Sequence, residues 1–169
     1  MHKRRVVITG LGAVTPIGNT TSEFWEGCIS GKNGVALITR FDASRFETKF
    51  AGEVKDFNTD LYFDKKAARR VDRFTLFSVA SATQALADSG INLEETDKNR
   101  FGVIYGSGIG GLRTLEEQTE KYFKDRDPRC ISPFFVTMMI ADISAGQISI
   151  KFGLKGPNYS TTSACATAS

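Results

Sequence analysis

The chain has 169 residues, of which 41% are apolar and 24% charged, and its formal net charge at neutral pH is +3. This length suffices for one domain with its own core, and the composition is that of an ordinary soluble globular protein. The small net charge argues against nucleic acid as a partner, although an acidic protein could dock on a local basic patch. The three cysteines are widely spaced without a C-x-x-C pattern, so we expect no metal site and a reducing compartment.

The basic N-terminus leads into a short β-branched stretch. Residues 5–9 predict a buried first strand. Its apolar run, residues 6–8, is too short for a signal peptide or a membrane span, so we expect a cytoplasmic protein. Further on, Thr20 and Glu23 have the spacing of a capping box, which predicts a short helix that ends at Gly31.

The next part of the chain mixes aromatic and charged residues. Residues 35–63 have no clean period and predict loops with one edge strand near residues 50–54. Residues 64–73 carry basic side chains at helical spacings, a pattern that by itself favours a solvated helix face. These side chains are Lys65, Lys66, Arg69, Arg70 and Arg73. Residues 71–89 then predict the clearest helix of the chain, rich in small residues and capped by Gly90.

A glycine loop follows the next predicted strand. Residues 101–105 predict that strand, residues 106–111 fit G-x-G-x-x-G, and a helix is expected from residue 112 to about 123. A dinucleotide site also needs an acidic residue at the end of a second strand about twenty residues on. Residues 125–127 supply acids at that distance, but in or after a helix. We therefore expect no nucleotide cofactor and interpret the loop as backbone that passes close to something bulky.

The C-terminal third alternates between structure types again. Residues 131–136 are apolar and irregular, residues 141–152 predict a helix, and a further strand is expected to end at Cys165. Strands that alternate with crossover helices predict an α/β fold, with a mostly parallel sheet covered by helices on both faces.

Cys165 stands among small side chains at the expected strand-to-helix turn. At a helix N-terminus, unpaired amides and the helix dipole would lower the pKa of a thiol and could form an oxyanion hole. Free cysteines are usually buried structural residues, and local context alone leaves the two interpretations evenly balanced. The only histidine is His2, so a cysteine–histidine pair would need a partner beyond Ser169 or on another subunit.

Seven segments, spread in collinear order over nearly the whole sequence, carry a resemblance to a known family. They are residues 4–12, 16–19, 50–52, 106–111, 131–135, 153–157 and 162–165. Together they resemble the N-terminal half of the β-ketoacyl-acyl-carrier-protein synthases, with the bacterial type II condensing enzyme as the closest match. The resemblance implies the thiolase-like fold, in which two similar α/β halves stack into five layers. Residues 1–169 would form the first half, cut as the nucleophile helix begins.

The resemblance also implies a reaction. In that family the cysteine takes an acyl group from acyl carrier protein as a thioester. Malonyl carrier protein then loses CO2, and the resulting carbanion attacks the thioester, which lengthens a fatty acid by two carbons. Two histidines and a lysine that assist decarboxylation belong to the second half, so we expect this half alone to be inactive.

Residue roles follow from the same resemblance. Cys165 matches the nucleophile, and its amide would be one of two oxyanion donors. Ile109 matches the gate of the acyl pocket, and Phe134 matches a residue that reaches the partner subunit's acyl pocket across a homodimer interface. Basic residues that would dock acyl carrier protein are Lys66, Arg69, Arg70 and Arg129. Cys130 stands where a further basic residue is common, so docking there would be weaker.

Three other interpretations stay open on the sequence alone. A type I synthase or a polyketide ketosynthase would share this superfamily and chemistry. A non-catalytic half-domain would bind the carrier protein without accepting an acyl group. A nucleotide-binding oxidoreductase would use the glycine loop, although the acidic residues about twenty positions on lie in or after a helix instead of at the end of a strand. We expect no metal and no cofactor.

Overall fold

The computed structural model describes residues 4–167. These residues form two compact units. The first contains the N-terminal part up to Asn58 together with Thr83–Gly90, and the second contains Thr59–Ala82 together with the chain from Ile91 onward.

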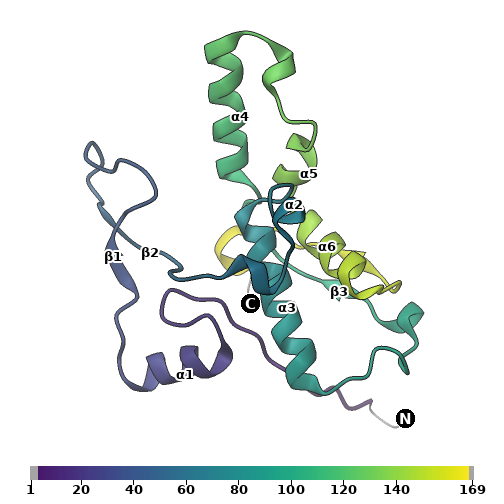
Figure 1. Ribbon diagram of the computed structural model, residues 1–169. Helices are drawn as coiled ribbons and strands as arrows, with labels where there is room; N and C mark the ends of the chain where they lie inside the picture. The colour runs from purple at the N-terminus through teal and green to yellow at the C-terminus, as the bar shows by residue number, and fades with distance from the viewer. Residues whose placement is uncertain (1–3, 168–169) are drawn as a thin grey trace. The chain divides into compact units, whose positions relative to one another are not determined.

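The first unit holds a short helix, a two-stranded hairpin and the end of a longer helix (Figure 1). Helix α1 (Thr21–Ile29) begins at the predicted capping box, where Thr20 Oγ1 accepts the Glu23 amide at 3.2 Å. Strands β1 (Val35–Leu37) and β2 (Phe50–Gly52) pair antiparallel. Strand β2 confirms the edge strand expected near residues 50–54.

The strand predicted over residues 5–9 is wrong. The chain has no regular structure there, and Val6 and Ile8 are 95% and 83% exposed. A strand forms only where a second backbone pairs with it, and in residues 4–167 no backbone pairs with this stretch. The glycine that follows does pack closely, because a Cβ on Gly10 would lie 2.1 Å from the Ala85 carbonyl oxygen.

The second unit is mainly helical. Its α-helices are α2 (Lys65–Ala68), α4 (Leu112–Asp125), α5 (Phe135–Met139), α6 (Ile143–Phe152) and the first part of α3 (Arg73–Ser89), which continues into the first unit. Single 3-10 turns are η1 (Thr59–Leu61), η2 (Lys98–Arg100), η3 (Pro128–Cys130) and η4 (Ala164–Ala166). Strands β3 (Val103–Ile104) and β4 (Asn158–Tyr159) complete it.

The core of this unit lies where α6 packs on the parallel pair β3 and β4 (Figure 1). Its buried apolar side chains are Val79, Val103, Ala145, Ile148 and Leu154. Asn158 fastens β4 to α6, because its Nδ2 donates to the Ala145 carbonyl oxygen at 2.8 Å. The parallel pairing was expected from the alternation of strands and helices.

The sheet is smaller than the sequence predicted. Within the described residues it consists of one parallel pair and one antiparallel pair, and β4 ends at Tyr159 instead of at Cys165. Backbone hydrogen bonds extend the parallel pairing beyond β3 and β4 as far as the Ser107 amide, which donates to the Thr161 carbonyl oxygen at 3.3 Å. Beyond Ser107 the glycine loop turns away, with Gly110 at φ 91°, so residues 162–165 lose their partner.

The predicted helices are confirmed with small shifts of their bounds. Gly90 and Gly153 end α3 and α6 with φ of 64° and 69°, the left-handed conformation that favours glycine at a helix C-terminus. The helix expected over residues 64–73 is shorter, because only α2 forms there. A search of the helices within residues 4–167 finds none with the length and apolar character that a membrane span requires.

Candidate nucleophile and basic pocket

Cys165 lies exposed at the centre of the 3-10 turn η4. Ala164 before it has φ 48°, a left-handed conformation that is costly for a residue with a side chain and is enriched at active sites. Thr167 Oγ1 closes the turn by accepting the Ser163 amide at 2.9 Å. The α-helix N-terminus expected around Cys165 is therefore a single 3-10 turn in the described part, and the remainder of that prediction falls on residues 168 and 169, outside it.

The glycine loop of residues 106–111 packs against the segment that carries Cys165. A Cβ on Gly106 would lie 2.2 Å from Thr167 Cγ2 and 3.2 Å from the Thr161 carbonyl oxygen. Only a glycine allows this approach. The prediction that the loop passes close to something bulky is thus confirmed, and one of its neighbours is the segment that carries Cys165.

The other end of the same loop packs against α5. The Gly111 amide donates to the Met139 carbonyl oxygen at 2.8 Å, and a Cβ on Gly111 would lie 2.4 Å from the Met138 carbonyl oxygen. Ile109, between the two contacts, is 70% exposed, and Phe134, directly before α5, is 37% exposed. Backbone contacts therefore bring together the three segments that carry Cys165, Ile109 and Phe134.

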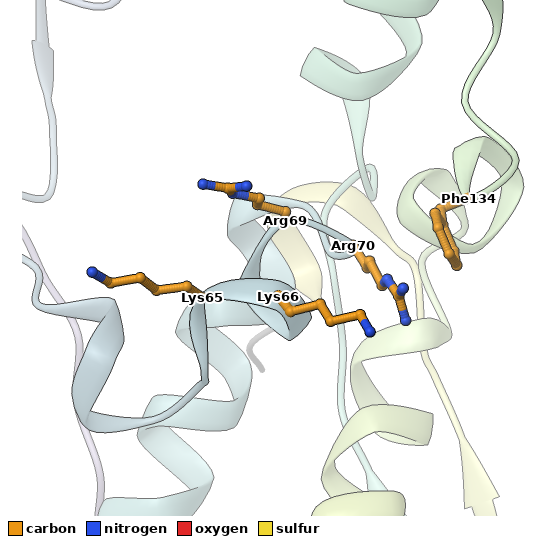
Figure 2. A pocket seen from close by; sticks show the side chains of 5 residues that line it. All are labelled: Lys65, Lys66, Arg69, Arg70 and Phe134. Carbon is orange, nitrogen blue, oxygen red and sulfur yellow. The ribbon is translucent and has the colours of Figure 1, made fainter.

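A second feature is a basic pocket of about 400 Å³ beside α2. It is lined by Lys65, Lys66, Arg69, Arg70 and Phe134. Figure 2 shows Lys66 and Arg70 extending toward Phe134, and the Arg70 guanidinium carbon lies 4.7 Å from the centroid of that ring. An arginine over an aromatic face is held by a cation–π interaction, which keeps the Arg70 charge beside Phe134 in the pocket lining.

Asp64 orders the backbone that presents these cations. Its Oδ1 accepts the amides of Ala67 and Lys66, both at 2.8 Å, and so caps α2. These hydrogen bonds hold the pKa of Asp64 below its ordinary value, and the bond from the Ala67 amide has the largest effect. Across residues 4–167, no carboxylate forms an ion pair with the four pocket cations, which leaves the pocket positively charged.

Arg129 does not line this pocket. Its Nη2 lies 2.9 Å from Asp127 Oδ2, and this pairing lowers the pKa of Asp127 and raises that of Arg129. Lys65, in contrast, lines the pocket but was absent from the predicted docking residues. Its position in the same basic run as Lys66 was the signal that could have included it.

The family comparison covers nearly the whole chain. The model of the N-terminal domain of beta-ketoacyl synthases matches residues 3–169. The 3-oxoacyl-[acyl-carrier-protein] synthase 2 of Synechocystis sp. is 47% identical over 169 residues, which are 100% of this chain and 40% of that protein. The protein of the same name from Coxiella burnetii is 49% identical over 167 residues, which are 99% of this chain and 40% of that protein.

Solved structures agree with the sequence comparison. The ishigamide ketosynthase/chain length factor superposes with a TM-score of 0.86 at 26% identity, over 95% of this chain and 40% of that one. The chain thus spans 40% of the length of these relatives. The structure superposes on a ketosynthase and has the N-terminal half of the thiolase-like fold. Because the family model also matches almost every residue, the chain belongs to the beta-ketoacyl synthase family and corresponds to the N-terminal domain of its members.

Proposed function

We propose that this chain supplies the acyl-accepting cysteine of a 3-oxoacyl-[acyl-carrier-protein] synthase of type II, an acyltransferase of fatty acid elongation. One observation carries the proposal. Cys165 is exposed on a strained turn packed against the glycine loop, in a chain that is 47% identical over its full length to a synthase of that name. The relatives that are named synthase 2 are 47% and 49% identical to this chain, which supports the type II assignment.

The first step is acyl transfer to sulfur. Cys165 Sγ attacks the carbonyl carbon of an acyl thioester on the carrier protein, the bond from that carbon to the carrier's sulfur breaks, and the carrier leaves as its thiol. The amide of Cys165 donates to no acceptor in the described part of the chain, so it is available to the oxyanion of the tetrahedral intermediate. Ala164 and Ala166 on either side leave room for the acyl group.

The second step is carbon–carbon bond formation. Malonyl carrier protein loses CO2, the carbanion attacks the acyl carbonyl carbon, and the Cys165 thiolate is released as the chain grows by two carbons. Decarboxylation in this scheme uses two histidines and a lysine. The sequence contains one histidine, His2, so we propose that these groups come from outside residues 1–169.

The acyl chain, a second subunit and the carrier protein each contact other residues of the chain. We assign Ile109 to the gate of the acyl pocket and Phe134 to the pocket of a second subunit in a homodimer. The acidic carrier protein docks at the basic pocket, on Lys66, Arg69 and Arg70. Lys65 joins these docking residues because it lines the same pocket. Arg129 contributes from outside the pocket. We further propose that the protein works in the cytoplasm.

Selective alkylation tests the nucleophile. Cys165 and Cys28 are both exposed, whereas Cys130 is half-buried, so exposure alone predicts similar rates for the first two. In the complete protein we expect iodoacetamide and cerulenin to modify Cys165 much faster than Cys28 or Cys130, as followed by peptide mass spectrometry. Equal rates at Cys165 and Cys28 would contradict the proposal.

A further inference from the structure

Asp72 connects the beginnings of two helices. Its Oδ1 accepts the Phe74 amide at 3.3 Å in the first turn of α3. Its Oδ2 accepts both the amide of Thr114, at 3.3 Å, and the Thr114 hydroxyl, at 2.5 Å, in the first turn of α4. Thr114 is only 4% exposed, so this contact lies inside the second unit.

Helix α4 depends on this contact for its cap. The residue before it, Gly111, has no side chain and makes no capping hydrogen bond. Asp72 takes over that role from another element, because it accepts the amide of the third helical residue and places a carboxylate at the positive end of the helix dipole. A Cβ on Gly111 would lie 3.2 Å from Asp72 Oδ2, so the glycine also leaves room for this carboxylate.

The two helix starts adjoin the two features of the proposed function. Asp72 follows the basic segment by two residues, with Arg70 as its last pocket cation. Helix α4 begins directly after the glycine loop that carries Ile109. That loop is otherwise tethered through the Ser107 and Gly111 amides, on Thr161 and Met139. The Asp72–Thr114 contact is therefore a side-chain link between the docking segment and the helix that anchors the gate loop.

We propose that Asp72, acting through Thr114, is a positioning residue that fixes the gate loop of Ile109 relative to the carrier-docking segment and so sets the range of acyl chain lengths. This inference rests on the proposed function. Neither Asp72 nor Thr114 touches the reacting atoms. Their loss loosens the loop while the nucleophile and the docking cations stay in place.

The experiment compares Asp72→Asn, Thr114→Val and Thr114→Ser in the complete protein. The readout is kcat/KM for acylation of Cys165 by carrier proteins that bear a short or a long acyl chain. The ratio of kcat/KM for the long chain to kcat/KM for the short chain should move toward one by roughly three- to tenfold in Asp72→Asn and in Thr114→Val. In Thr114→Ser, which keeps the hydroxyl, this ratio should stay within about twofold of the wild type. Asp42→Asn is the matched control, because Asp42 Oδ1 accepts the Ser44 amide within an exposed turn, and it should leave the ratio unchanged.

Each outcome decides the question. A lower unfolding temperature with an unchanged ratio in both Asp72→Asn and Thr114→Val would reduce the contact to a structural cap and overturn the inference. If Asp72→Asn does not fold, the comparison of Thr114→Val with Thr114→Ser decides by the same ratio. If the wild type itself shows no acylation of Cys165, the proposed function fails, and this inference fails with it.

Discussion

At the scale of single residues, the position of the candidate nucleophile depends on a missing side chain. Gly106 lets Thr161 and Thr167 approach the glycine loop more closely than any other residue allows. The glycine spacing predicted a close approach, but it could not name the partner, because Thr161 and Thr167 are far along the chain. The strained φ of Ala164 likewise has no signature in the sequence.

Gly106→Ala should displace the turn that carries Cys165. The added methyl meets Thr167 Cγ2, and a misplaced nucleophile loses roughly two orders of magnitude in rate for a shift of about 1 Å. We expect acylation and alkylation of Cys165 to slow by about tenfold or more. Addition of Thr167→Ser, which removes the clashing methyl, should restore part of the rate.

Gly108→Ala is the matched control for this change. A Cβ on Gly108 meets nothing within 4 Å, so the variant should react close to the wild-type rate. Equal rates in Gly106→Ala and Gly108→Ala would show that the close approach does not position Cys165.

At the scale of elements, the sequence predicted the helices more accurately than the strands. Helices α3, α4 and α6 were predicted within two residues because their periodicity and the glycines beside them are local in the sequence. The strand predicted at residues 5–9 does not form, and the strand predicted to end at Cys165 ends at Tyr159, because strand pairing depends on a second segment that local patterns do not contain. The Asp72–Thr114 cap was missed for the same reason.

Helix α2 is an element that a single side chain sustains. Four residues are too few to form a helix by propensity, so its order depends on the two amides that Asp64 accepts. Asp64→Ala should disorder the basic segment and weaken carrier-protein binding several-fold, as measured by calorimetry. Asp97→Ala, which removes an equivalent cap from η2, should leave that affinity unchanged, and a loss of affinity in both variants would contradict the assignment.

The same cap predicts a pH dependence. The pKa of Asp64 is below its ordinary value of 3.8, so the cap is fully formed above about pH 5 and is lost as the pH falls through the lower pKa of the folded state. The stability difference between wild type and Asp64→Asn should therefore be constant from about pH 8 to 5 and shrink below about pH 4. Chemical denaturation at stepped pH measures it, and a difference that shrinks already above pH 5 would argue against a depressed pKa.

At the scale of the whole molecule, charge is unevenly distributed. The net charge is only +3, yet four cations gather at one pocket, while the salt bridges that the described residues form lie elsewhere. The basic run at residues 65–70 was visible in the sequence, whereas Phe134, which completes the pocket, comes from a distant segment. An acidic carrier protein would meet this concentrated charge rather than the small net charge.

Arg69→Glu with Arg70→Glu should weaken carrier-protein binding by at least tenfold at low salt and flatten its salt dependence, because exposed charges are screened by ions. Lys49→Glu with Lys155→Glu makes the same change in net charge at exposed positions outside the pocket, and it should have little effect. Surface plasmon resonance over a range of salt concentrations distinguishes the two pairs. An equal loss in both would mean that net charge, and not the pocket, controls binding.

The most direct test of the account is the intact mass of the complete protein after incubation with acylated carrier protein. We predict a gain of one acyl group at Cys165 that persists in Cys28→Ala and disappears in Cys165→Ala. No covalent adduct, or an adduct that survives Cys165→Ala, would contradict the central claim that Cys165 holds the acyl chain as a thioester.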